Sequence, residues 1–188
     1  ILQAVNSVLN QTFSDFELIV VDDGSKDDGP GKIKLLKDKR LKIICQENKG
    51  VSSARNKGVK IAKYDHIAFL DADDWWDKSF LKDMNLLVEQ YPDAGIYGCN
   101  YYSVKNGKYR ITDKGLEKGF TKGYINYLKA YAKTFCATFN SSSVIVDKEA
   151  FNTVSRFNPA LKFGEDFDLW IRLALKYKVS YLNKPLSY

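Results

Sequence analysis

The sequence has little histidine and little cysteine, and both shortages exclude classes of site. His66 is the only histidine in 188 residues, so neither a Ser-His-Asp triad nor a Cys/His zinc site is expected. The three cysteines, Cys45, Cys99 and Cys136, are odd in number, widely spaced and set among apolar residues. We expect buried free thiols at all three positions. Any catalysis by this chain is therefore expected to depend on carboxylates.

Long hydrophobic runs are also absent. The longest apolar stretch, Leu18 to Val21, suits a strand and falls far short of the ~18 residues that a membrane-spanning helix needs. Ile1 opens directly into an amphipathic stretch with no charged leader, so no secretory signal is predicted. Hydrophobic residues make up 45% and charged residues 28%, which is ordinary for one globular domain. We therefore expect a single cytoplasmic domain spanning residues 1–188.

The chain carries a formal net charge of +6, and the segment 32–42 is rich in lysine. A solvated helix face explains this segment. The alternative is attraction to an anionic membrane or a polyanionic substrate, because a positive field raises encounter with negative partners. Aromatic residues do not interleave with lysine and arginine as a base-stacking surface requires, so nucleic acid is not an expected partner.

Strands and helices are predicted to alternate through the first half of the chain. Apolar periodicity and turn residues give a helix at 1–9, a strand at 16–21, a helix around 33–36, a strand at 41–45, a helix at 50–63, a strand at 66–70 and a helix at 78–90. Ser25 or Asp27 is expected to cap the second helix. This alternation favours βα units on a mostly parallel sheet with helices on both faces.

The second half has a different pattern. It is predicted to contain a strand at 94–104, a polar, turn-rich segment at 105–119 with a tight turn at Asn106-Gly107, one or two strands within 135–146, and a helix at 165–178. The apolar face of that helix is expected to carry Leu169, Leu173 and Leu175. The shift near residue 100 indicates two lobes of one domain.

Acidic residues gather at the ends of predicted elements. Asp22-Asp23 and Asp71-Ala72-Asp73-Asp74 each follow a predicted strand, and Glu165-Asp166 opens a predicted helix. In an open parallel sheet, ligands bind outside the carboxyl ends of the strands, so the first two clusters should face one crevice. Magnesium or manganese is the natural partner for crowded carboxylates beside phosphate. A turn or N-cap role explains any one cluster alone, but three together favour a shared site.

Four blocks of sequence, in order, resemble family-2 glycosyltransferases of the GT-A fold. The blocks are Gln11-Thr12-Phe13 with Phe16-Glu17-Leu18-Ile19-Val20-Val21-Asp22-Asp23-Gly24-Ser25, then Gly50-Val51-Ser52-Ser53-Ala54-Arg55-Asn56-Lys57-Gly58, then Phe69-Leu70-Asp71-Ala72-Asp73-Asp74, then Gly164-Glu165-Asp166 with Leu169-Trp170. The resemblance covers nearly the whole chain. It implies an α/β fold with a Rossmann-like, mostly parallel sheet flanked by helices and a smaller mixed or antiparallel portion. Residues 1–100 would form the nucleotide-sugar half, and residues 101–188 the acceptor half.

The resemblance also implies a role for each acidic block. The expected donor-binding residues are Asp22, Asp23, Arg55, Asp71 and Asp73. Asp73, with Asp71, would hold Mn²⁺ or Mg²⁺ on the donor diphosphate. Asp166 resembles the general base, with Glu165 beside it. Trp75, Trp76 and Trp170 are candidates for the sugar or acceptor site, although core packing is the expected role for at least one of them.

The activity that this resemblance implies is metal-dependent sugar transfer with inversion. The donor would be a nucleotide-diphosphate sugar, with UDP-sugars favoured, and the acceptor a saccharide or lipid-linked saccharide of bacterial surface polysaccharide synthesis. Such a reaction would occur in the cytoplasm, at the inner face of the cell membrane. The alternatives are a nucleotidyltransferase and a non-catalytic module that binds nucleotide sugars.

Two features depart from the family pattern. The family's first strand should precede Ile1, so we expect a fragment with a gap in its sheet and part of the nucleotide site missing. The Gln-x-x-Arg-Trp element of processive members is not found, which favours the addition of one sugar per encounter.

Overall fold

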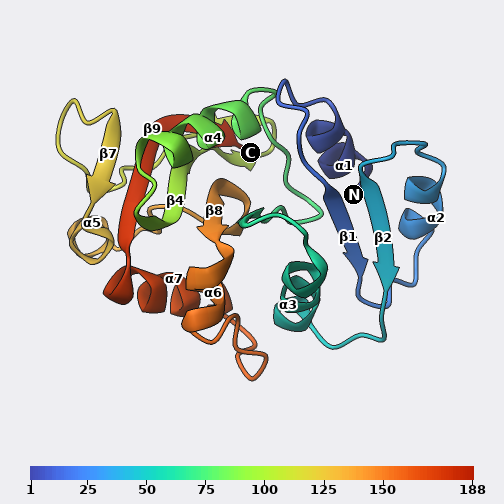
Figure 1. Ribbon diagram of the computed structural model, residues 1–188. Coiled ribbons are helices and arrows are strands. Elements are labelled where there is room, and N and C mark those ends of the chain that lie inside the picture. The colour runs from blue at the N-terminus through green and yellow to red at the C-terminus, as the bar shows by residue number, and fades with distance from the viewer.

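The computed structural model describes residues 1–188 and contains α-helices packed around three groups of strands (Figure 1). The elements are α1 (Leu2–Leu9), β1 (Leu18–Asp22), α2 (Gly29–Lys34), β2 (Leu41–Cys45), α3 (Val51–Ile61), β3 (His66–Ala68), α4 (Phe80–Gln90), β4 (Ala94–Tyr101), β5 (Ser103–Lys105), β6 (Lys108–Arg110), β7 (Lys122–Ile125), α5 (Tyr127–Thr134), the 3₁₀ helix η1 (Ser141–Ser143), β8 (Val144–Asp147), α6 (Lys148–Thr153), α7 (Glu165–Lys176) and β9 (Lys178–Ser187).

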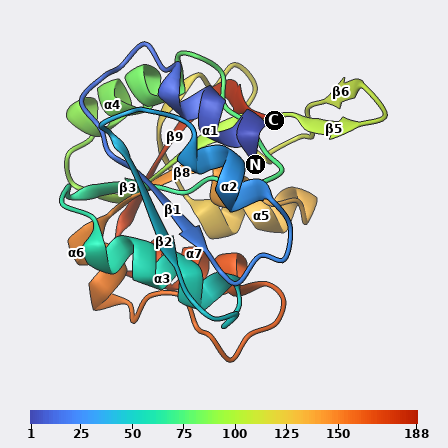
Figure 2. The same cartoon turned by 90° about the vertical axis from the view of Figure 1, so that its right-hand side faces the viewer.

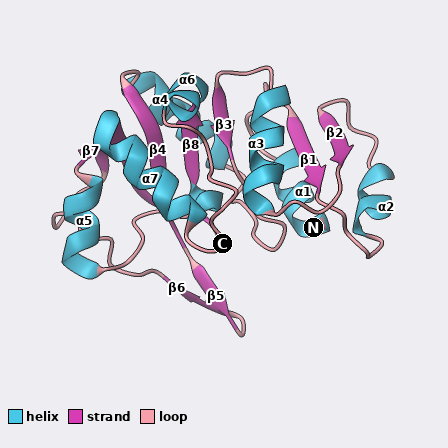
Figure 3. Ribbon diagram, turned by 90° about the horizontal axis from the view of Figure 1, so that it is seen from below, coloured by secondary structure: helices cyan, strands magenta, loops and turns pink.

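The strands form a two-stranded parallel sheet, a five-stranded mixed sheet and a separate hairpin. Strand β1 pairs with β2 in parallel, whereas the larger sheet has the order β3-β8-β4-β9-β7. Within the larger sheet only β4 and β9 are parallel, and the other three pairings are antiparallel. Figure 3 shows the strands of both sheets side by side, with α3 between β3 and β1 in this view. The predicted α/β alternation is confirmed for the first half of the chain.

The space between β1 and β3 is an apolar groove of about 580 Å³. Its walls include Val5 of α1, Val20 of β1, Val59 of α3 and Ile67 of β3. No strand of the chain lies there, so neither β1 nor β3 has a second neighbour in its sheet. The gap expected from the sequence is therefore present, and its lining extends to Arg55.

The two faces of the larger sheet bury separate hydrophobic clusters. Val144 and Val146 of β8 point into a cluster formed with α3, α6 and α7, which includes Trp170. Ile145, between them, points into a second cluster with α1 and α4, which includes Trp76. This alternation follows the period of two along a strand. Both faces of the sheet are therefore covered, as in α/β domains.

Several predicted elements are corrected by the structure. The strand expected at 94–104 ends at Tyr101, and the chain then enters the β5–β6 hairpin. The strands expected within 135–146 are reduced to β8, because the chain before it is irregular and ends in η1. Asp28 is the N-cap residue of α2, in place of Ser25 or Asp27. The predicted tight turn is confirmed, since Asn106 and Gly107 both have positive φ.

Some burial expectations were also wrong. Only Cys99 is buried, whereas Cys45 is exposed at the end of β2 and Cys136 is half-buried. Leu175 is 70% exposed, while Leu169 and Leu173 of the same helix are fully buried. Leu175 lies six residues after Leu169, which at ~3.6 residues per turn places it away from the buried face.

The lysine-rich segment 32–42 contains only the last turn of α2, then a turn and the start of β2. It is therefore not one continuous helix face. None of the helices combines the length and apolar character that crossing a bilayer demands.

Gly95 lies at a bulge in β4, and we predict that Gly95→Ala destabilises the fold. The register of β4 against β9 shifts between Ala94 and Ile96, which leaves Gly95 as the extra residue. A methyl group there would lie 2.6 Å from Cβ of Tyr177 and 3.1 Å from Cβ of Ala150, and neither atom can rotate away. The free energy of unfolding in urea should fall by about 1–3 kcal/mol.

Gly31→Ala is the matched control for this substitution. It also lies in a regular element, but a methyl group added there meets no atom within 4 Å. Its unfolding free energy should stay unchanged or rise by up to ~1 kcal/mol. Equal effects of the two substitutions would contradict the packing explanation.

Candidate active site

Arg55 joins three of the four sequence blocks. Its guanidinium donates from Nη2 to Asp71 Oδ1 at 2.7 Å and from Nη1 to Glu165 Oε1 at 2.9 Å. The side chain is only 11% exposed, and it lies over the Phe157 ring at 5.1 Å. A planar fork with permanent charge is the group best suited to bind two carboxylates at once. Arg55 therefore fixes the loop after β3 relative to the start of α7.

The neighbouring residue strengthens the same connection. The Asn56 side-chain amide donates to the Phe157 carbonyl and accepts from the Phe157 amide. Helix α3 is thus bound to the loop that leads into α7 through two consecutive side chains.

Asp23 organises the start of α3. Its carboxylate accepts hydrogen bonds from Gln46 Nε2 at 2.6 Å and from the backbone amides of Lys49 and Gly50 at 2.9 and 2.8 Å. Burial alone would raise the pKa of Asp23, but these donors outweigh it and hold the pKa below its ordinary value. A residue expected to bind the donor therefore also shapes the loop that begins α3.

Asp22, next to Asp23, is bound within the segment that follows β1. It accepts from the Ser25 amide at 2.9 Å, and hydrogen bonds from Ser25 lower its pKa. Asp22 is the last residue of β1 and Asp23 follows it, as expected at the carboxyl end of a parallel strand.

The loop Asp71–Asp74 is held by Ser142 of η1, which sequence reasoning missed. The Asp71 amide donates to Ser142 Oγ at 3.0 Å, and Ser142 also bonds the Asp74 carboxylate. Half-burial raises the pKa of Asp74, and the adjacent Asp71 and Asp73 add to that effect. The run of three serines at 141–143 carries no motif, so only the fold could show that Ser142 supports this loop.

Asp73 is the carboxylate of this loop that remains available. It is exposed and takes part in none of the side-chain hydrogen bonds or ion pairs, whereas Asp71 is bound to Arg55. The structure has no ready group of three or more side chains arranged to hold a metal ion. Mg²⁺ and Mn²⁺ need only one or two carboxylates when substrate phosphates and water supply the other oxygens. Asp73, exposed and free of ion pairs, could supply one such carboxylate.

Asp166 and Glu165 begin helix α7 and lie in different environments. Glu165 is paired with Arg55, while no cation pairs with Asp166. Burial raises the pKa of Asp166, the amide of Phe167 opposes the rise, and the charge of Glu165 adds to it. A carboxylate with a raised pKa and no ion-pair partner can accept a proton near neutral pH more readily than an ordinary Asp.

The three tryptophans divide between core and site. Trp170 is 1% exposed and Trp76 is 6% exposed, and Trp76 stacks on Phe80 at 4.0 Å. Both therefore belong to the core. Trp75, which follows the acidic loop, is only half-buried and stacks on Tyr188 at 5.5 Å.

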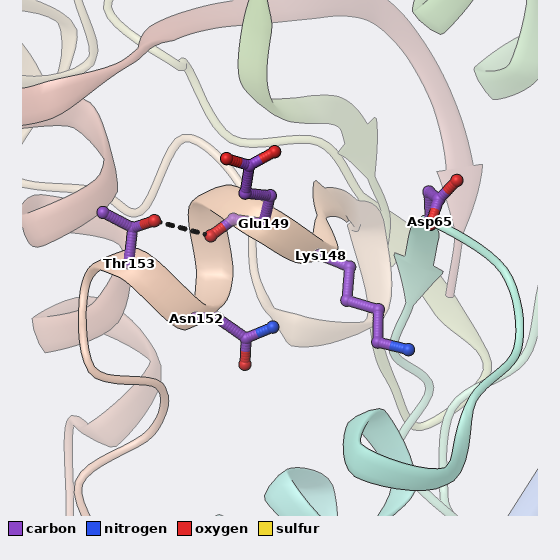
Figure 4. A pocket seen from close by; sticks show the side chains of 5 residues that line it. All are labelled: Asp65, Lys148, Glu149, Asn152 and Thr153. Carbon is purple, nitrogen blue, oxygen red and sulfur yellow. Dashed lines mark hydrogen bonds between the residues drawn. The ribbon is translucent and has the colours of Figure 1, made fainter.

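A second concavity, of about 500 Å³, lies where β3 meets α6, and it lacks convergent chemistry (Figure 4). Lys148 and Glu149 point in different directions, and the Thr153 hydroxyl donates to the Glu149 carbonyl within α6. None of the residues predicted for the site lines it.

A family model for glycosyl transferase family 2 matches residues 1–151. Over 187 residues the chain is 28% identical to an uncharacterised glycosyltransferase of Rickettsia conorii, which covers 99% of this chain and 30% of that protein. Over 109 residues it is 40% identical to WfaP of Escherichia coli, a UDP-Glc:α-D-GlcNAc-diphosphoundecaprenol β-1,3-glucosyltransferase, which covers 56% of this chain and 42% of WfaP. The chain thus spans less than half the length of each of these relatives.

Crystal structures of Staphylococcus aureus TarS superpose on the whole chain. The complex of TarS residues 1–349 with UDP has a TM-score of 0.84 and 23% sequence identity, and this chain covers 55% of it. A complex of the same protein with UDP-GlcNAc is also known. These similarities establish the fold.

We predict strong energetic coupling between Arg55 and Glu165. In a double-mutant cycle with Arg55→Ala and Glu165→Ala, the coupling energy from urea unfolding should be about 1–3 kcal/mol, because both side chains are at least 86% removed from solvent. Arg55→Ala leaves Glu165 unpaired, whereas Glu165→Ala leaves Arg55 with Asp71 alone. The exposed pair Lys32–Asp28 is the control and should give about 0.5 kcal/mol or less. Similar coupling in the two pairs would show that Arg55 does not hold α7.

Proposed function

This chain belongs to glycosyl transferase family 2, and we propose that it transfers a sugar from a nucleotide-diphosphate donor to an acceptor hydroxyl with inversion. Its fold is the GT-A fold predicted from the sequence. The observation that carries the proposal is the Arg55 bridge, which gathers the acidic loop and the Glu165-Asp166 pair into one site. Family membership favours this reaction over the nucleotidyltransferase alternative.

A UDP-sugar is the donor that we favour. TarS has been crystallised with UDP and UDP-GlcNAc, and WfaP is named for its use of UDP-Glc. In this chain Asp22 and Asp23 lie at the end of β1, where a nucleoside would meet the sheet edge. Their lowered pKa values keep both carboxylates ionised near neutral pH, so each can accept a hydrogen bond from a base or ribose.

The acceptor that we favour is a saccharide, including a lipid-linked saccharide of bacterial surface polysaccharide synthesis. WfaP is named for an acceptor of this kind. The reaction would then occur in the cytoplasm, at the inner face of the membrane, with one sugar added per encounter.

The leaving diphosphate gains negative charge as the sugar departs. Asp73, with Asp71 beside it, would hold Mn²⁺ or Mg²⁺ there, and the bound cation supplies Lewis-acid stabilisation of the leaving group. Arg55 contributes a fixed positive charge next to Asp71.

Asp166 is our candidate for the general base. As the acceptor oxygen forms its bond to the anomeric carbon, the bond from that carbon to the diphosphate breaks, and the electron pair leaves with the diphosphate. The acceptor hydroxyl proton passes to the Asp166 carboxylate. Attack from the face opposite the leaving group inverts the anomeric configuration, as in the water-activating half of an inverting glycosidase.

Asp166→Asn should slow transfer by about 10²–10⁴-fold while raising stability near neutral pH. The pKa of Asp166 is higher in the folded state than the unfolded value of about 3.8. Asp166 therefore stabilises the fold below the unfolded pKa, and this stabilisation is lost as pH rises through the folded-state pKa. An uncharged amide avoids that cost and keeps the bond from Phe167. Thermal unfolding and a radiolabelled-donor transfer assay measure the two effects, and the assay should also show activity falling as Asp166 becomes protonated at low pH.

Asp168→Asn is the matched control, two residues further along α7. Asp168 is paired with Arg172 at 2.6 Å, so its substitution should lower stability slightly. Both substitutions remove one negative charge from the first turn of α7. The loss of its favourable interaction with the helix dipole is therefore the same in the two variants. Full transfer activity in Asp166→Asn would remove Asp166 from the role of base.

Donor binding tests the assignment of Asp73. UDP should raise the melting temperature of the chain more strongly when Mn²⁺ is present, because ligands that bind the native state stabilise it. Asp73→Asn should abolish the Mn²⁺-dependent part of that rise. Asp65→Asn, an exposed carboxylate at the second concavity, should leave it intact. A Mn²⁺-dependent rise that survives in Asp73→Asn would place the metal elsewhere.

A further inference from the structure

Lys114 is the one charged residue that is buried in this fold. It lies four residues after the projecting β5–β6 hairpin, where the chain returns to the body of the protein (Figure 2). The residue is 3% exposed, and it takes part in none of the eight ion pairs of the structure. A buried ammonium group with no carboxylate beside it destabilises a fold, unlike the lysines at the surface of this chain.

Three groups surround the Lys114 ammonium. Nζ lies 3.5 Å from the centroid of the Tyr101 ring, and it donates to Thr112 Oγ1 at 2.9 Å and to the Ala137 carbonyl at 3.3 Å. The Tyr101 hydroxyl donates to the same carbonyl at 3.2 Å. Lys114 therefore joins its own loop to the end of β4 and to the segment that follows α5.

That segment, residues 135–140, runs between α5 and η1 and has no strand partner. Side chains hold it instead. The Lys114 ammonium donates to the Ala137 carbonyl, and the Tyr181 hydroxyl of β9 donates to the Thr138 carbonyl at 3.2 Å. Because no ladder of amide bonds fixes the segment, its position depends on these few donors.

The same segment adjoins both acidic parts of the proposed active site. The Phe139 ring packs on the Trp170 ring at 6.0 Å, and Trp170 lies one turn after Asp166 in α7. At its other end the segment leads into η1, where Ser142 holds the loop Asp71–Asp74. A shift of this segment would therefore change the surroundings of the proposed base and of the acidic loop together.

We propose that Lys114 is a positioning residue for sugar transfer, whose ammonium group holds the segment 135–140 in place beside Asp166. The inference rests on the proposed function, and it assigns Lys114 no contact with the donor or the reacting atoms. Its charge destabilises the fold, but that charge strengthens both the hydrogen bond to Ala137 and the attraction to the Tyr101 ring.

The charge state of Lys114 gives this contact a pH dependence. Burial lowers the pKa of Lys114 to about 8, and the thiols of Cys136 and Cys99 offset that effect only in part. Burial also raises the pKa of Tyr101 and of Cys99, so neither is ionised near neutral pH. Asp113, the adjacent acid, binds a backbone amide of its own loop and forms no ion pair. The segment should therefore be held less firmly as pH rises through about 8.

Lys114→Met tests the proposal, because it removes the charge and keeps an unbranched side chain. Its urea midpoint at pH 7 should equal or exceed that of the unmutated chain. Unfolded lysine keeps its proton up to a pKa of about 10.5, whereas folded Lys114 releases it at about 8, so stability gains a contribution as pH rises between these values. Lys114→Met should lack that gain. Amide hydrogens of 135–140 should nevertheless exchange about tenfold faster in this variant.

Transfer is measured from UDP-Glc to an alkyl-linked GlcNAc diphosphate, the donor and acceptor types for which WfaP is named. Lys114→Met should lower kcat about 10–100-fold, since small misplacements near a reacting group are costly, and leave KM for UDP-Glc unchanged. In the unmutated chain kcat should fall as pH rises through about 8, and Lys114→Met should lack this fall.

Lys133→Met is the matched control. Lys133 is exposed in α5, two residues before the segment, and forms no ion pair. This variant should keep the kcat, the pH dependence and the slow exchange of the unmutated chain. Equal exchange rates or equal kcat values in the two variants would overturn the proposal. A Lys114→Met chain that is less stable at pH 7, or that does not fold, would make Lys114 a structural residue and overturn it as well.

Exchange and transfer, measured on the same samples, keep the two proposals separate. Normal transfer without a difference in exchange between the variants would reject the role of Lys114 and leave the proposed function standing. An unmutated chain that shows the exchange difference from Lys114→Met but neither binds UDP nor transfers sugar would reject the proposed function, while Lys114 would still be shown to hold the segment.

Discussion

The salt bridges of Arg55 are the constraint on which the site depends. The residues that we assign to catalysis come from segments far apart in the chain, and no strand pairing joins β1–β2 to the larger sheet. Arg55 is carried by α3, which stands between the two sheets, and its two carboxylate partners belong to the loop after β3 and to α7. Asp23 determines where α3 begins through the amides of Lys49 and Gly50. The nucleoside end of the site is thereby connected to the catalytic end by one helix.

The same bridge separates the roles of two adjacent acids. Arg55 neutralises Glu165 and leaves Asp166 without a partner, so burial can raise the pKa of Asp166. Had both acids been paired with cations, neither would be an effective proton acceptor near neutral pH. Similarly, Arg55 occupies Asp71 and leaves Asp73 open to solvent. One buried cation thus decides which carboxylates are ion-paired and which are left without a cation.

The sequence predicted where the acidic residues lie along the chain better than it predicted the second half of the fold. Asp22 and Asp23 lie at the end of β1, and Asp71 and Asp73 lie in the loop after β3, as the apolar runs before them indicated. The antiparallel pairing of β3 with β8 could not be predicted, because His66 and Asp147 are 81 residues apart and no local pattern links them. Ser142 was missed for the same reason: its role comes from its distance to Asp71 in space, and its neighbours in sequence give no sign of it.

The groove between β1 and β3 determines how the β1–β2 unit is attached to the larger sheet. The β1–β2 unit is attached to the rest by side chains, loops and helices, with no ladder of amide bonds across the gap. The amide hydrogens of β1 and β2 should therefore exchange with solvent at a lower opening free energy than those of β4. Strand β4 has a partner strand on each side. Within residues 1–188, Asp22 and Asp23 therefore lie in the unit that has the weaker backbone connection to the larger sheet.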